Sequence, residues 1–187
     1  MELDNYLTLI QNNCDELIDE YSEDILKHLK SKENQISVDF SKPQIDFIEP
    51  KSWGIYAFFI HPKKDISTYV ELEELWIEKL NNKKLKSPNV IQQRFQKLEK
   101  NKTYCFYVGK SENLKKRISQ HIHQATNPST YGLKLSEHDK IHKSNTFSFA
   151  YFILKNNPNQ NIGAMKFILE SLEKHIREEL KPLVGKQ

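Results

Sequence analysis

Three short apolar runs constrain the fold of this chain more than any other feature. They are residues 54–60 (GIYAFFI), 103–109 (TYCFYVG) and 147–154 (FSFAYFIL). Runs of this length, rich in aromatic and β-branched residues, are typical of β-strands, and an almost unbroken apolar run indicates a strand covered on both faces. None of them approaches the roughly 20 apolar residues of a membrane-spanning helix. We therefore expect three strands in one buried sheet and no membrane span.

Segments with helical periodicity surround these runs. Residues 4–30 form an amphipathic stripe with acidic residues opposite the apolar ones. Apolar residues spaced by four predict a helix over 114–122, for which Ser111 is a candidate N-cap. A third stripe predicts a helix over 163–180 that ends before Pro182. The order of elements predicts a small α/β fold in which helices cover the sheet.

The charged stretch 61–102 lies between the first two predicted strands. Its apolar positions predict one helix over 72–80 and a second over 90–98, which Ser87-Pro88 would begin. Residues 35–50 have no helical pattern and contain two prolines, so we expect them to form an extended connector.

Charge divides the chain into two parts. Residues 1–50 hold four basic and twelve acidic residues, a net charge of −8, and residues 51–187 hold 24 basic and 13 acidic residues, a net charge of +11. The division predicts an acidic helical extension (1–50) and a basic domain (51–187) with an insertion (61–102). A charge of +11 suits a polyanion such as nucleic acid, although a lysine-rich surface also serves solubility alone. The acidic N-terminus has no basic or hydrophobic leader, so we expect a cytoplasmic protein.

Five potentially functional side chains follow the predicted strands and helices in a regular order. Gly54-Ile55-Tyr56 opens the first strand, and Tyr107-Val108-Gly109 ends the second. Arg117 and His121 follow four positions apart, which places them one turn apart on one helix face, and Glu173 is on the last helix. Arginine binds phosphate through a planar fork, histidine can move a proton near neutral pH, and a carboxylate can hold a hard divalent ion.

Each of these residues could also have a purely structural role. A tyrosine such as Tyr56 in an apolar strand is usually a core residue, and Arg117 belongs to a basic run (115–117) that could be a solvated helix face. Residues His121 and His123 could be surface histidines.

Two carboxylates on the last helix are candidates for the metal ligand. Glu173 lies four residues before Arg177, and such a pair contributes only about 0.3–0.5 kcal/mol. Glu170 is a competing metal ligand, with Lys174 as its possible ion-pair partner.

Together, these motifs resemble the GIY-YIG nuclease family over residues 52–185, without the insertion 61–102. The resemblance implies a three-stranded antiparallel sheet flanked by helices, with a helical insertion between the first two strands and an N-terminal helical extension. Two features depart from the family pattern. Tyr56 and Tyr107 are 51 positions apart, whereas compact members join the two motifs by a short loop. Gly185 stands where the family often carries an asparagine.

The resemblance implies a phosphodiesterase that uses one metal ion, Mg²⁺ or Mn²⁺. In this mechanism Tyr56 is the general base, or relays a proton from water to His121, while Arg117 stabilises charge on the phosphate. Glu173 holds the metal, since its spacing to Pro182 fits the family pattern better than that of Glu170. Tyr107 positions water or phosphate. The residues expected to contact nucleic acid are Gly109, Lys110, Lys115 and Lys116.

The expected function is that of a divalent-metal-dependent endonuclease acting on double-stranded DNA, of the restriction or mobile-element defence type. A non-catalytic nucleic-acid-binding or assembly module on the same fold is the alternative. Residues 1–50 could support a homodimer or bind a protein partner.

Overall fold

The computed structural model describes residues 3–41, 45–77, 87–123, 132–154 and 161–185. Its centre is an antiparallel sheet with the strand order β1-β5-β2-β4, formed by β1 (Ile36–Ser37), β5 (Asn145–Leu154), β2 (Trp53–Pro62) and β4 (Tyr104–Ser111). The sheet therefore has four strands, and the expectation of three was wrong. Residues 36–37 were expected in a connector, but their backbone pairs with Phe149 and Ser148 at the edge of β5.

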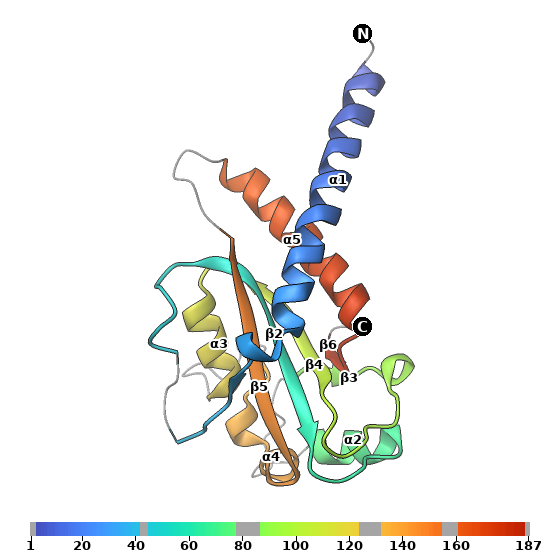
Figure 1. The fold of residues 1–187 in the computed structure, drawn as a ribbon, viewed down its shortest axis with the longest axis vertical. Coiled ribbons are helices and arrows are strands. Elements are labelled where there is room, and N and C mark those ends of the chain that lie inside the picture. Colours follow the sequence, from blue (N-terminus) through green and yellow to red (C-terminus); the bar gives the residue numbers. More distant parts are fainter. Residues whose placement is uncertain (1–2, 42–44, 78–86, 124–131, 155–160, 186–187) are drawn as a thin grey trace.

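Helices cover both faces of the sheet (Figure 1). Helices α1 (Leu3–Lys30) and α5 (Ile162–Leu180) pack on one face, where Ile25, Leu29 and Leu172 share a core with Ile55 and Val108. Because β2 is central and covered on both sides, its residues from Ile55 to Ile60 are all buried, as its unbroken apolar run predicts.

Three further helices cover the opposite face of the sheet. Helices α3 (Leu114–Ile122), α4 (Asp139–Ser144) and α2 (Tyr69–Trp76) lie there. The alternation of β2 turns Tyr56 and Phe58 toward this face, where they join a core with Phe149 and Ile118. The N-cap of α3 is Asn113, whose side-chain oxygen accepts from the Lys116 amide at 3.1 Å, and not Ser111 as predicted.

The insertion contains one described helix where two were expected. The predicted helix over 72–80 corresponds to α2, and its end beyond residue 77 lies outside the described residues. The predicted helix over 90–98 is absent. Instead, β3 (Asn89–Val90) pairs with β6 (Val184–Gly185), and the short 3-10 helix η2 (Gln92–Arg94) follows. A distant backbone partner therefore overrides the local apolar spacing in this segment.

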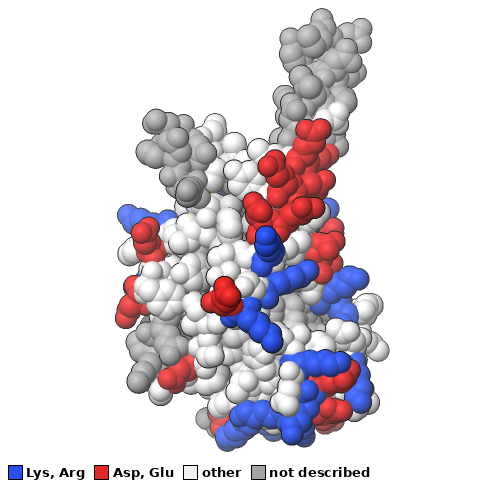
Figure 2. All heavy atoms as spheres, viewed as in Figure 1, with Lys and Arg blue, Asp and Glu red and all other residues white. Residues whose placement is uncertain are grey.

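Helix α1 carries the acidic charge predicted for the N-terminal extension. Figure 2 shows acidic side chains gathered along this helix, and Figure 1 shows its N-terminal half projecting beyond the sheet. Within the described part of the chain, neither α1 nor any other helix has the length and apolar character needed to cross a bilayer.

Candidate active site

A cleft of about 400 Å³ lies at the β4 edge of the sheet, where residues from β2, β4, α3, α5 and β6 meet. Four of the predicted catalytic residues line it: Tyr56, Tyr107, Arg117 and Glu173. The fifth, His121, is completely buried and contacts the phenol group of Tyr56. The structure thus brings all five residues together, although they span more than a hundred positions of the sequence.

The phenol oxygen of Tyr56 forms hydrogen bonds with two other members of the cluster. His121 Nε2 lies 2.8 Å from Tyr56 Oη, and Arg117 Nε donates to the same oxygen at 3.3 Å. The side chain is 1% exposed, and burial raises the pKa of Tyr56 well above its ordinary value even though Arg117 acts in the opposite direction. At neutral pH the group is therefore a neutral phenol that accepts two hydrogen bonds.

The backbone fixes the tautomer of His121. The amide N–H of Leu133 donates to His121 Nδ1 at 2.9 Å, so Nδ1 acts as an acceptor. Burial, followed by the charge of Arg117, holds the pKa of His121 well below its ordinary value, so the ring is neutral. A neutral imidazole has one N–H group, which must then be at Nε2 and donate to Tyr56.

Arg117 is half-buried and does not face solvent as its place in a basic run suggested. Its Nη1 donates to Gln120 Oε1 at 3.3 Å, while its Nε holds Tyr56. Burial alone would lower the pKa of Arg117, but the phenol groups of Tyr56 and Tyr107 raise it overall. A guanidinium has five N–H groups, so Arg117 can keep these contacts and still donate to a phosphate.

Gly109 leaves the space that the Tyr56 ring occupies. The two residues are direct neighbours across the β2–β4 ladder, and a Cβ atom on Gly109 would overlap the phenol oxygen and lie 2.7 Å from Tyr56 Cζ. A glycine is therefore needed for the ring to reach the cleft.

Replacing Gly109 with alanine should displace the Tyr56 ring and lower any activity of this site by about 10²-fold, the cost typical of an ångström of misplacement. The change should be visible as altered chemical shifts of the Tyr56 ring in a labelled sample. A Gly109→Ala protein with wild-type rates and unchanged Tyr56 resonances would show that the close approach is not required.

Two carboxylates line the cleft beside the tyrosines, and each has a basic partner. Glu173 is 18% exposed and lies 3.5 Å from Arg177, the pair anticipated from the sequence. Glu170 is 70% exposed, and its partner is Lys110 at 2.6 Å and not Lys174. Glu173 thus lies deeper in the cleft, whereas Glu170 lies in solvent at its margin.

The residues present suit a metal ion held by a single carboxylate. Among the described residues no group of three or more histidine, cysteine, aspartate or glutamate side chains could form a complete metal cage. Mg²⁺ and Mn²⁺ do not need one, since they retain several waters and take further oxygen ligands from phosphate. The hard oxygen of Glu173, in a cleft that is open to solvent, matches this requirement.

The four residues predicted to contact nucleic acid are divided between the cleft and helix α3. Lys110 lines the cleft, as does Gly109. Lys115, however, pairs with Asp46 at 3.1 Å, and Lys116 is exposed on α3. Neither of these two lysines is among the residues that line the cleft.

The sequence did not identify three groups that contribute to the site. The Leu133 amide acts through its backbone, which no side-chain pattern reveals, and Gln120 carried no motif. Arg177 was noticed only as an ion-pair partner of Glu173, yet it lines the cleft together with Gly185. The spacing of Gln120 three positions after Arg117 on one helix is the signal that could have identified it.

Another hollow of similar size, about 400 Å³, lies between α1, α5 and the end of β5. It is lined by apolar and aromatic side chains such as Leu17, Tyr21 and Ile168. Its described lining includes no carboxylate, histidine, lysine or arginine, so it offers no comparable chemistry.

Most of this chain matches a known protein family. The family model of the GIY-YIG catalytic domain matches residues 54–183, which include both tyrosines, Arg117, His121 and Glu173. No curated protein and no solved structure gives a match. Since the matched region covers more than half of the chain, this protein belongs to the GIY-YIG catalytic domain family.

Proposed function

We propose that this protein is a divalent-metal-dependent endonuclease that hydrolyses phosphodiester bonds, with double-stranded DNA as the expected substrate. The family is one of nucleases, which implies a nucleic-acid substrate. The observation that supports catalysis in this chain is the Tyr56 hydroxyl group, held by Arg117 and His121 in a cleft that Glu173 also lines. A module that only bound nucleic acid would not need a buried tyrosine with two fixed donors.

In the proposed mechanism Tyr56 is the general base. Its phenolate takes a proton from a water molecule, and the resulting hydroxide attacks phosphorus while the bond to the 3′ oxygen breaks. The N–H groups of Arg117 and His121 stabilise the phenolate by hydrogen bonding. His121 is less suited to accept the proton, since its Nδ1 lone pair receives the Leu133 amide and its Nε2 already carries a proton.

The remaining groups of the cleft stabilise charge. Arg117 donates to the phosphate oxygens as negative charge develops there. Glu173 would hold Mg²⁺ or Mn²⁺, which supplies positive charge beside the leaving oxygen when bound. Tyr107 positions water or phosphate, and Lys110 contacts the phosphate backbone. One such site cuts one strand, so a duplex break requires two copies or two successive cuts.

The rate of cleavage should rise with pH because the base is a minority species at neutral pH. Burial raises the pKa of Tyr56, so below that pKa the phenolate fraction grows about tenfold for each pH unit. We expect the logarithm of the single-turnover rate to rise with a slope near one between roughly pH 6 and 9.

Tyr56→Phe is the control for this pH profile. The variant removes the titrating oxygen and should cleave at a low rate that no longer follows this slope. A Tyr56→Phe protein that keeps both the slope and the rate would identify a different base, such as a metal-bound water.

The proposed function is tested with labelled duplex DNA, single-stranded DNA and RNA of one sequence, each incubated with and without Mg²⁺. We expect cleavage of the duplex that requires the metal and leaves 5′-phosphate and 3′-hydroxyl ends. Metal-independent binding of all three substrates without cleavage would favour the alternative, a non-catalytic nucleic-acid-binding module.

A restriction or mobile-element defence role is the setting that we propose for this activity. The acidic surface of α1 would be repelled by phosphates, which supports a protein partner or a second copy as the ligand of residues 1–50. Sedimentation of the full chain, with and without duplex DNA, distinguishes a monomer from a dimer.

A further inference from the structure

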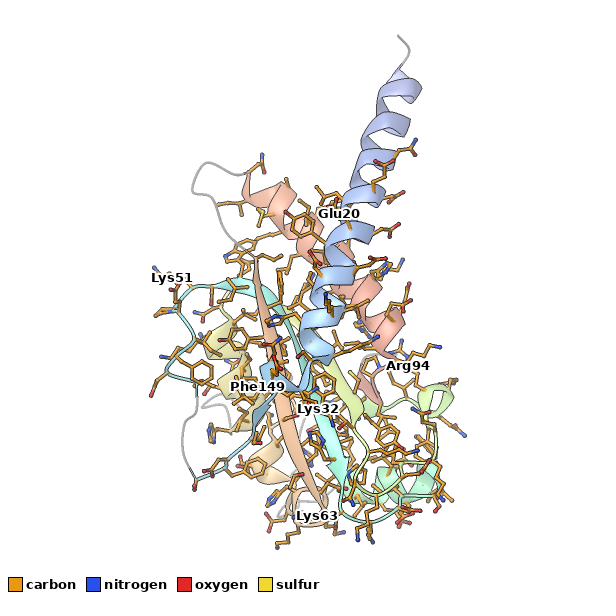
Figure 3. The ribbon with its side chains drawn as sticks, in the orientation of Figure 1. Glu20, Lys32, Lys51, Lys63, Arg94 and Phe149 are labelled. Atoms are coloured by element: carbon orange, nitrogen blue, oxygen red, sulfur yellow. The ribbon has the colours of Figure 1, made fainter. Side chains whose placement is uncertain are left out.

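An arginine of the insertion lies next to the active-site cleft. Arg94 ends the 3-10 helix η2, and the insertion is fixed there by the Ile91 amide, which donates to Leu183 O at 2.8 Å. The pairing of β3 with β6 fixes the same segment to Gly185, which lines the cleft. Figure 3 shows Arg94 beside the C-terminal end of α5.

The described part of the chain does not satisfy the hydrogen-bonding needs of Arg94. Its Nη1 is buried and has no hydrogen-bond partner among the described residues. A buried charged donor without an acceptor is costly, and native proteins rarely keep one without a purpose. Arg94 as a whole residue is only half-buried, so part of its side chain remains in contact with solvent.

A second arginine adds positive charge to the same corner. Burial lowers the pKa of Arg94, and the nearby charge of Arg177 lowers it further. Arg177 Nη2 would lie 3.5 Å from a Cβ atom on Gly185, so the missing side chain at that position leaves room beside the guanidinium. The positive charges of the two guanidinium groups repel each other, and an oxyanion bound by both would offset that repulsion.

We infer that Arg94 and Arg177 form a second phosphate-binding site at the Gly185 corner of the cleft, apart from the Tyr56–Arg117 centre. Its ligand is a phosphodiester group of the bound strand that neighbours the one cleaved. Arginine suits this role because its planar fork can hold two phosphate oxygens at once. The inference rests on the proposed function for the identity of the strand, but the anion site itself can be tested without cleavage.

The variants for the test are Arg94→Gln, Arg177→Gln and the double variant, with Lys97→Gln as the matched control. Lys97 lies three residues after Arg94 and is exposed and paired with Asp65. Binding of a fluorescent duplex is measured by anisotropy in EDTA across a salt series. Each single variant should bind roughly tenfold more weakly and lower the salt slope by about 0.9, the value for one lost phosphate contact. Because both arginines share one phosphate, the double variant should lower the slope by the same amount and not by twice as much.

A second arm uses inorganic pyrophosphate and follows the midpoint of thermal unfolding. Pyrophosphate should stabilise the wild type and Lys97→Gln but neither arginine variant. Without ligand, Arg94→Gln should unfold at or above the wild-type midpoint, because it removes an unsatisfied buried charge.

The two arms separate the failure of this inference from failure of the proposed function. Suppose that pyrophosphate stabilises the protein only when both arginines are present, but the protein neither binds nor cuts nucleic acid. The anion site is then correct and the proposed nuclease function is wrong. The inference is overturned if Arg94→Gln and Arg177→Gln both cleave and bind duplex DNA as well as the control Lys97→Gln does. A lower unfolding midpoint for Arg94→Gln with unchanged duplex binding would overturn it as well, since Arg94 would then be a structural residue.

Discussion

Replacing Arg117 with alanine is expected to lower the single-turnover rate of cleavage by about 10²–10³-fold, the usual cost of removing one donor to a developing oxyanion. The loss has two sources, because Arg117 donates to Tyr56 Oη at 3.3 Å and would also donate to the phosphate. The substitution removes the positive charge that favours the phenolate, so the pH profile should shift toward higher pH at the same time.

Arg117→Lys should recover little of this activity. An ammonium group restores the charge, but its N–H groups share one nitrogen atom and cannot span Tyr56, Gln120 and a phosphate as the guanidinium does. Lys143→Ala, a change of an exposed cation that pairs with Asp139 on α4, is the control and should cleave at the wild-type rate. An Arg117→Ala protein that is folded and cleaves within threefold of the control would remove Arg117 from the mechanism.

Replacing Glu173 with alanine is expected to abolish metal-dependent cleavage while the protein still binds nucleic acid. The loss of a metal ion that stabilises the leaving oxygen costs several kcal/mol, or roughly 10³-fold in rate. Isothermal titration with Mn²⁺ measures the metal site directly and should show no binding to the variant. Binding of duplex DNA should be kept or strengthened, because one negative charge leaves the cleft and Arg177 loses its carboxylate partner at 3.5 Å.

Glu170→Ala is the matched control for Glu173. Its carboxylate is four times as exposed and pairs with Lys110 at the margin of the cleft. This variant should bind Mn²⁺ and cleave nearly as the wild type does. If Glu170→Ala is inactive and Glu173→Ala is active, the metal ligand is Glu170. If both are active at saturating Mg²⁺, the one-metal mechanism fails.

The parts of the fold that the sequence predicts are those with a strong local pattern. The run at 54–60 identified β2 and its burial, and the spacing of Leu114, Ile118 and Ile122 identified α3 with its buried face. The edge strand β1 has only two residues and no pattern, since its contribution is backbone pairing to β5. Val90 lies in a strand because Val184 is its partner, a contact that no local window contains.

The candidate site divides in the same way. The sequence selects Tyr56, Arg117 and His121 as candidates because each belongs to a motif on an expected element. The burial of Arg117 and the tautomer of His121 could not, since both depend on how α3 packs against β2 and on the backbone of Leu133. The role of Arg94 depends on β6, which brings the end of the chain to the insertion.

The most direct test of the account is a time course of plasmid nicking by the wild type and by an Arg117→Ala/Glu173→Ala double variant purified in parallel. Supercoiled DNA is mixed with each protein in excess, and the reaction is started with Mg²⁺ at fixed pH. We expect nicked circles with extendable 3′-hydroxyl ends for the wild type, none in EDTA, and none for the double variant. Equal nicking by both proteins, or no nicking by a folded wild type that binds the plasmid, would contradict the proposed mechanism.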